Sequence, residues 1–119
     1  MGIRLLLAVQ AAVFGVAATI HAGVLTHGYE HVRARTAEGV IAAVLVVGLF
    51  MTAIAVRQLR TIALGVQGFA LLGTLVGLFT IAIGVGPRSV LDLALHATMV
   101  TLLTAGLVMT RRTTTIAGG

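Results

Sequence analysis

The sequence predicts an all-α fold, an up-down-up-down bundle of four transmembrane helices. Hydrophobic residues make up 59% of the 119 residues and charged residues only 9%. Soluble domains are typically about one quarter charged, so lipid is expected to cover most of this surface. Four apolar segments are each long enough to cross the hydrocarbon core, which takes about 20 helical residues. They are too long and too continuous to be barrel strands of about 10 alternating residues.

The spans and their connections define one domain. The four spans are expected, in chain order, at residues 5–25, 37–56, 61–85 and 90–110. The segments 57–60 and 86–89 join the second span to the third and the third to the fourth. Such short links make neighbouring helices antiparallel. Residues 1–112 therefore form the transmembrane domain, and residues 113–119 are expected to be a flexible tail.

The start of the fourth span has the clearest local signal in the chain. Pro87 is the only proline, and Ser89 is followed three residues later by Asp92. This spacing matches a capping box, which predicts a helix start. His96 lies four residues beyond Asp92 and is therefore expected on the same helical face, one turn deeper.

The basic residues predict the orientation. All eight are arginines, five of them at the amino terminus, the second loop and the tail, and three in the first and third loops. The positive-inside rule then places both termini in the cytoplasm. Residues 1–22 also have features of a signal peptide, but their apolar run is longer than usual, so a retained helix is expected.

The acids and histidines gather on the predicted outer side. They comprise all three acids and all four histidines of the chain: Glu30, Glu38, Asp92, His21, His27, His31 and His96. His21 and His96 are expected at similar depth on adjacent helices. Ionisable groups within a span usually face the bundle interior, a cavity or each other, so the sequence predicts that these two imidazoles meet.

Three interpretations of this cluster remain open. In the structural one, the histidines hydrogen-bond across helices, Asp92 and Glu38 cap helix starts, and Glu30 pairs with Arg33 or Arg35. In the second, His21 and His96 bind a b-type haem or a transition metal, since imidazoles and carboxylates suit such ions. Supporting residues for that metal or haem site would be Asp92, Glu38, His27 and His31. In the third, His21, His96 and Asp92 relay protons or ions.

The inner half of the bundle holds two glutamines. Gln10 and Gln67 each lie about six residues into their spans from the cytoplasmic side, at a depth of about 9 Å for a rise of 1.5 Å per residue. Their equal depth predicts an interhelical hydrogen bond. No acid or histidine lies at mid-membrane, which disfavours a coupled transporter.

The third span has a strip of small residues. Gly73 and Gly77 form a GxxxG motif, and Thr80 and Gly84 continue the strip along one face. Small residues allow helix backbones to approach closely. The strip is expected to pack inside the bundle or against another chain. A bundle of 12.2 kDa encloses little volume, which favours a homo-oligomer or a place in a larger membrane complex.

Several function classes are disfavoured. The chain has no cysteine, which excludes disulfides, thiolate metal sites and cysteine nucleophiles. It contains no phosphate-binding glycine loop and no HExxH motif. The arginines flank apolar segments, so they indicate topology rather than nucleic-acid binding. Enzymatic activity by this chain alone is not expected.

The run from Gly68 to Arg88, followed by Asp92 and His96, resembles a group of small uncharacterised bacterial four-span membrane proteins. The resemblance implies a bacterial inner-membrane protein and no particular activity. Small multidrug exporters have a similar length and four spans, but this chain lacks their membrane-embedded glutamate in the first helix.

These observations favour a non-enzymatic accessory or self-associating subunit of a larger membrane complex, respiratory or otherwise energy-transducing. The alternative is a small haem- or metal-binding membrane protein with an outer-side site. Ion or proton transport is the third hypothesis.

Overall fold

The computed structural model describes the backbone of residues 2–117 and the side chains of residues 2–113. Over this range it has no strand and four α-helices: α1 (Ile3–His21), α2 (Val32–Ile54), α3 (Leu59–Ala82) and α4 (Val90–Ala117). A short 3-10 helix, η1 (Val56–Gln58), precedes α3. Each α-helix is long and apolar enough to cross a membrane. The predicted all-α, four-helix transmembrane fold is therefore confirmed.

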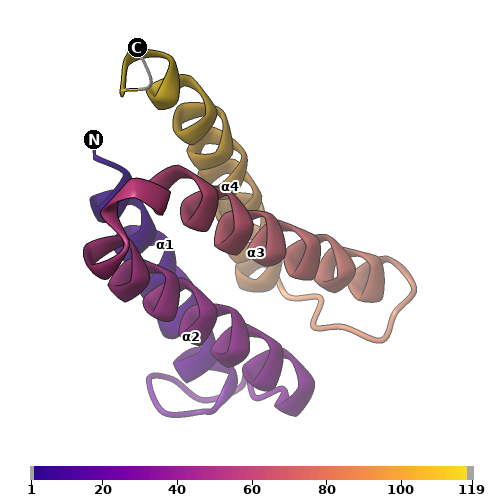
Figure 1. The fold of residues 1–119 in the computed structure, drawn as a ribbon. Coiled ribbons are helices and arrows are strands. Elements are labelled where there is room, and N and C mark those ends of the chain that lie inside the picture. The colour runs from indigo at the N-terminus through magenta and orange to yellow at the C-terminus, as the bar shows by residue number, and fades with distance from the viewer. Residues whose placement is uncertain (1, 118–119) are drawn as a thin grey trace.

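The helices form a ring. α1 packs most extensively on α2, and α3 packs most extensively on α4. Contacts of α2 with α3 and of α1 with α4 close the ring, whereas α1 and α3 barely touch. Figure 1 shows α2 and α3 diverging as they run away from the turn that joins them. The far end, which carries loops 22–31 and 83–89, is called the histidine end below.

The first helix is shorter than predicted because a glycine ends it. Gly23 has a φ of +75°, in the left-handed region that favours glycine. The amide of Val24 donates to the carbonyl of Thr19 at 3.1 Å, which is the six-to-one bond of a Schellman cap. His21 is consequently the last residue of α1, at the histidine end, rather than a residue inside a longer helix.

The third helix ends in the same way. Gly84 has a φ of +87°, and the amide of Val85 donates to the carbonyl of Thr80 at 2.9 Å. Gly84 was expected within the packing strip of the third span. It lies instead just beyond the helix, where it terminates α3.

The other two helices are longer than predicted. α2 begins at Val32, and the side chain of His31 caps it by accepting a hydrogen bond from the amide of Ala34 at 3.1 Å. α4 continues to Ala117, through most of the segment expected to be a flexible tail. Residues 118 and 119 of that expected tail lie outside the described part of the chain.

The bundle interior is a small apolar core with close helix contacts. Its largest fully buried apolar side chains come from α1, α2 and α4: Leu7, Phe14, Leu45, Met99 and Leu103. α3 approaches α2 at Gly48, where a Cβ atom would lie 2.7 Å from Cγ1 of Val66. Real Cβ atoms do not approach so closely, so this packing requires glycine.

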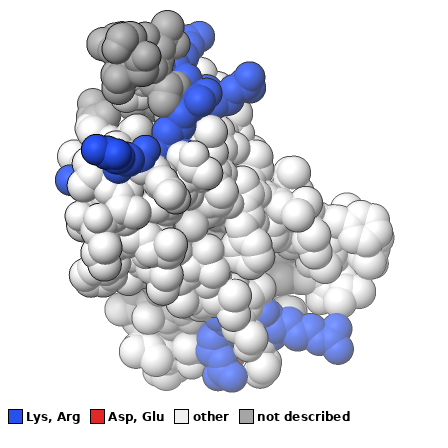
Figure 2. All heavy atoms as spheres, viewed as in Figure 1, with Lys and Arg blue, Asp and Glu red and all other residues white. Residues whose placement is uncertain are grey.

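The surface has the charge pattern of a membrane-spanning bundle. Figure 2 shows the basic side chains gathered at two ends of the molecule, with uncharged surface between them and no acidic side chain on this face. Two of the three acids, Glu38 and Asp92, are buried at 5% and 3% exposure. Lipid-exposed large apolar side chains cover the rest, as expected where lipid is the solvent.

Two glycines of α2 provide a matched test of this packing. Gly48→Ala is expected to destabilise the bundle by about 1–3 kcal/mol, because the added methyl group overpacks the contact with Val66. Gly39→Ala is the control, since a Cβ there meets nothing within 4 Å and alanine favours the helix by about 0.5–1 kcal/mol. Unfolding in detergent with increasing dodecyl sulfate measures both. Equal stability of the two variants would contradict the close contact.

Candidate functional site

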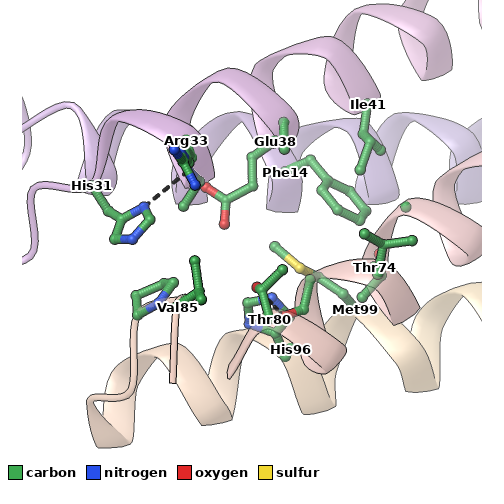
Figure 3. A pocket seen from close by; sticks show the side chains of 17 residues that line it. Phe14, His31, Arg33, Glu38, Ile41, Thr74, Thr80, Val85, His96 and Met99 are labelled. Atoms are coloured by element: carbon green, nitrogen blue, oxygen red, sulfur yellow. Dashed lines mark hydrogen bonds between the residues drawn. The ribbon is translucent and has the colours of Figure 1, made fainter. Parts of the chain in front are cut away.

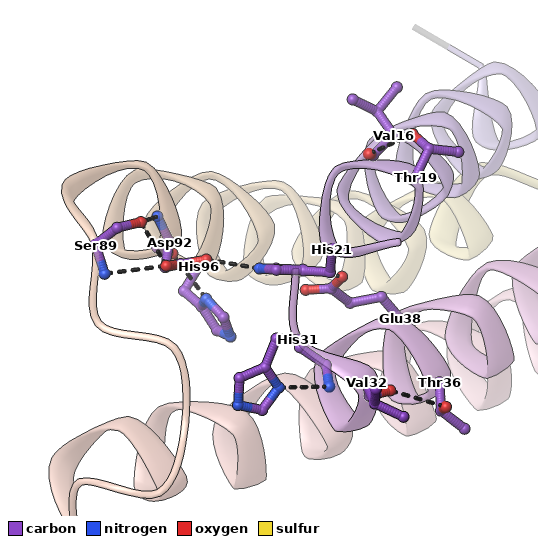
Figure 4. A network of polar contacts seen from close by, with 11 residues as sticks. Val16, Thr19, His21, His31, Val32, Thr36, Glu38, Ser89, Asp92 and His96 are labelled. Atoms are coloured by element: carbon purple, nitrogen blue, oxygen red, sulfur yellow. Dashed lines mark hydrogen bonds and ion pairs between the residues drawn. The ribbon is translucent and has the colours of Figure 1, made fainter. Parts of the chain in front are cut away.

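A buried histidine joins three helices at the histidine end. Nδ1 of His21 lies 2.7 Å from Oε2 of Glu38 on α2, and Nε2 lies 2.6 Å from Oδ1 of Asp92 on α4. The three residues are 1%, 5% and 3% exposed. Figure 4 shows the imidazole between the two carboxyl groups. His21, Glu38 and Asp92 are called the His21 cluster below.

The geometry of the His21 cluster determines how many protons it holds. Each of the two short nitrogen–oxygen contacts needs one hydrogen, and a neutral imidazole carries only one N–H. The second proton is therefore either on the ring, which makes an imidazolium between two carboxylates, or on one carboxyl group. Both arrangements have a net charge of −1.

Asp92 is fixed in the His21 cluster by the start of α4. The amide of Ser89 donates to Oδ2 of Asp92 at 3.0 Å, and the amide of Asp92 donates to Oγ of Ser89 at 3.1 Å. The Ser89 hydroxyl also contacts Oδ2. This reciprocal pair is the capping box that the sequence predicts. It leaves Oδ1 of Asp92 for His21.

His96 has one engaged nitrogen and one available nitrogen. Its Nδ1 lies 2.8 Å from the backbone carbonyl of Asp92. Because a carbonyl only accepts hydrogen bonds, Nδ1 carries the proton, and Nε2 of the neutral ring is an acceptor. No hydrogen bond to Nε2 comes from residues 2–113. His96 is 6% exposed, and a Cβ on Gly77 would lie 3.0 Å from its Nε2.

A pocket of about 180 Å³ lies beside the His21 cluster, between the diverging ends of α2 and α3. Figure 3 shows Glu38 and His96 at this pocket from different helices, with apolar side chains further in. The lining residues come from all four helices and from both loops of the histidine end: Phe14, His31, Arg33, Ala34, Ala37, Glu38, Ile41, Gly73, Thr74, Val76, Gly77, Thr80, Val85, Gly86, Pro87, His96 and Met99.

The remaining polar residues of the predicted outer cluster lie in the first loop. His27 is exposed and lies 3.6 Å from the carboxylate of Glu30, while Glu30 accepts from the amide of Gly28 at 3.0 Å. The expected pairing of Glu30 with Arg33 or Arg35 is not formed. His31 caps α2 and contacts the His21 ring edge-on at 6.4 Å between centroids.

The expected capping role of Glu38 is also corrected. The side chain of His31 caps α2, whereas Glu38 lies almost two turns further along the helix and faces His21. His27 and His31 do not share a helical face, because the first helix ends at His21 and neither residue lies in a helix. Glu30 and Glu38 both lie at the histidine end, as expected, but each contacts a different partner from the one that the sequence predicted.

The predicted metal or haem ligands are not grouped as a ligand set. Residues 2–117 contain no group of three or more histidines and acids that could hold a metal ion. Both ring nitrogens of His21 are engaged by carboxyl groups, so His21 has no nitrogen left for an iron or a metal. The His21–His96 axial pair stays a prediction that would require the His21 cluster to open.

The two glutamines in the half of the bundle away from the histidine end are hydrogen-bonded to each other. Nε2 of Gln10 donates to Oε1 of Gln67 at 2.9 Å and to the Leu102 carbonyl at 3.1 Å. Nε2 of Gln67 donates to Oγ1 of Thr110 at 2.9 Å. Thr110 is a partner that the sequence did not indicate, because a threonine in a span can bond its own preceding turn. Oε1 of Gln10 is buried without a partner among the described residues.

The glycine strip of α3 packs against neighbouring helices inside the bundle. A Cβ on Gly73 would lie 2.9 Å from Cδ1 of Ile41 on α2, and Gly77 faces His96 on α4. The hydroxyl of Thr80 donates to the carbonyl of Gly77 at 2.6 Å. The close approach of α3 to both neighbours therefore depends on these small residues.

Two acids provide a matched test of the His21 cluster. Glu38→Gln is expected to destabilise the protein by about 3–5 kcal/mol, because it removes one partner of a buried charged group. Glu30→Gln is the control, since Glu30 is exposed in the first loop and its loss should lower the unfolding midpoint far less than Glu38→Gln does. Dodecyl sulfate unfolding in micelles measures both. A Glu38→Gln protein as stable as the control would contradict the cluster.

The first loop has a predictable pH response. Backbone amides of Glu30 itself and of Gly28 hold the pKa of the Glu30 carboxyl below its usual value. A lowered pKa means that the stabilising contribution is present above the unfolded-state pKa and is lost as pH falls through the folded-state pKa. Carbon-13 NMR of the Glu30 carboxyl should show this lowered midpoint. The Gly28 amide should lose its exchange protection over the same pH range, and a Glu30→Gln protein should show no such transition.

Comparison with known proteins adds no assignment. No protein-family model, no curated protein and no solved structure matches this chain.

Proposed function

We propose that this chain is a non-enzymatic, multi-pass protein of the bacterial plasma membrane that binds one small, mainly apolar ligand in the pocket beside the His21 cluster. Both termini lie in the cytoplasm, and the pocket lies near the outer face. The observation that carries the proposal is the pocket itself, beside Nε2 of the buried His96, which has no hydrogen-bond partner among residues 2–113.

The size of the pocket supports a ligand of one ring. An apolar cavity of about 150 Å³ lined by leucine, isoleucine and phenylalanine binds benzene. The pocket here has about 180 Å³, which suits a single ring with a short substituent and is too small for a porphyrin. This size supports the ligand proposal over a haem site.

The position of the pocket supports access from the bilayer. It lies between α2 and α3, which are neighbours in the ring and diverge at the histidine end. Val76 on α3 and Ala37 on α2 both line the pocket and are also exposed on the apolar surface. A membrane-dissolved molecule would therefore enter between these two helices without crossing a charged surface.

Charge counts support the orientation. Five arginines lie near the end that carries both termini, and three lie near the histidine end. The excess of arginine is expected on the cytoplasmic side. Fluorescent or enzymatic reporters fused to the carboxyl terminus would report from the cytoplasm under this proposal.

Methionine methyl groups provide the binding test. Met99 lines the pocket and is 1% exposed, whereas Met51 and Met109 are 47% and 37% exposed on the surface. Ethylbenzene added to carbon-13-methyl-labelled protein in nanodiscs is expected to shift the Met99 signal saturably. The Met51 and Met109 signals should change only gradually, as the lipid takes up the probe.

Pocket and surface variants complete that test. Ala37→Phe places a ring in the pocket lining and should abolish the saturable shift. Val40→Phe on the same helix lies on the exposed surface outside the lining and should leave it unchanged. A wild-type protein without any saturable Met99 shift would overturn the proposed binding function.

An accessory or self-associating role is a second candidate, favoured by the outward face of α3. Gly65 and Gly68 face open space, since a Cβ on either meets nothing within 4 Å, and Phe69 and Leu72 beside them are exposed. The double substitution Gly65→Leu and Gly68→Leu should leave the folded monomer intact and abolish any close helix contact with another chain. Chemical crosslinking in native membranes, compared before and after this change, measures the effect.

A further inference from the structure

The polar atoms beside the pocket specify what kind of ligand fits it. In the neutral ring, Nε2 of His96 is an acceptor, because Nδ1 holds the one ring proton against the Asp92 carbonyl. Glu38 turns Oε2 toward His21, so any proton that Glu38 shares with His21 lies on that oxygen. Its Oε1, which accepts no hydrogen bond from residues 2–113, is a second acceptor. Both groups therefore call for a hydrogen-bond donor from the ligand.

Repulsion from Arg33 and the cost of desolvation disfavour a cation as that donor, against the attraction of the −1 charge of the His21 cluster. Arg33 lines the pocket on the α2 side, and a guanidinium is charged at every physiological pH. Moving an ammonium group into this mostly apolar space would also carry a desolvation cost of several kcal/mol per ion. A neutral hydroxyl group supplies the donor without either cost.

From these observations we infer that the ligand is a neutral, single-ring aromatic alcohol of the phenol or hydroquinone class, whose hydroxyl donates to Nε2 of His96. This inference deepens the proposed function and rests on it. The ring occupies the apolar part of the pocket near Phe14, Ile41 and Met99, and the hydroxyl reaches Nε2 of His96.

The backbone of α3 makes room for that hydrogen bond. Gly77 stands directly beside Nε2, and a methyl carbon added there would lie 3.0 Å from that nitrogen. A hydroxyl oxygen would lie at a similar distance, about 2.8 Å from its acceptor. Gly77 thus keeps the approach to His96 open, in addition to allowing α3 to pack on α4.

A matched pair of probes tests the hydroxyl donor. 4-Ethylphenol and 4-ethylanisole have the same ring and the same ethyl group, but only the phenol donates a hydrogen bond. The phenol is expected to bind about ten-fold more tightly, which corresponds to 1.4 kcal/mol, a usual value for one hydrogen bond to a buried group. The saturable Met99 methyl shift in nanodiscs gives both affinities, with Met51 and Met109 as internal references for partition into lipid.

Two variants connect the preference to His96. His96→Phe keeps a ring of similar size without an acceptor, and should reduce the ten-fold preference to about one-fold. Gly77→Ala keeps His96 but occupies the approach to Nε2, and should also remove the preference. Circular dichroism and the Met51 and Met109 signals establish that each variant is folded, so that a folding failure of one leaves the other as the test.

The outcomes separate the two proposals. Equal affinities of phenol and anisole in the unchanged protein would overturn the hydroxyl inference and leave single-ring binding standing. A preference that persists in both folded variants would also overturn it, because the donor would then bind elsewhere. Absence of a saturable shift with either probe would overturn the binding function and the inference together.

Discussion

The rest of the structure depends on one buried imidazole that is hydrogen-bonded at both nitrogens. A charged or strongly polar group in a medium of low dielectric constant is costly unless another group pairs with it. Here the partners come from α2 and α4, so satisfying His21 draws three helices together at the histidine end. Removing His21 leaves both carboxyl groups without this partner, and removing either acid leaves one buried imidazole nitrogen unpaired, which makes the His21 cluster a strong constraint on helix positions.

The same constraint explains why there is a pocket. α3 contributes no residue to the His21 cluster, and the cluster draws α1, α2 and α4 together at the end where α2 and α3 diverge. Gly73 and Gly77 let the backbone of α3 approach Ile41 and His96 but fill little space themselves. The space left between α2 and α3 is the pocket, and one of its polar groups, Glu38, is a member of the cluster.

Much of this arrangement could be predicted from the sequence, and the part that could not has a physical reason. Apolar length specified four helices, and the spacing of Ser89 and Asp92 specified the capping box. Equal depth indicated the Gln10–Gln67 pair. The partners of Glu38 were not predictable, because helix rotation about its own axis decides which face meets which neighbour. The end of α1 at His21 was not predicted, because a glycine is common within apolar spans. Only the backbone angle of Gly23 shows that it ends the helix.

The sequence separations within the His21 cluster have a consequence for how the protein is made. His21 and Glu38 are 17 positions apart on consecutive helices, whereas Asp92 follows His21 by 71 positions. Because synthesis proceeds from the amino terminus, the first hairpin enters the bilayer with its own histidine and glutamate already able to neutralise each other. The last helix then delivers its acid to an imidazole that is already in place, so each ionisable group meets a partner in the order in which the ribosome supplies it.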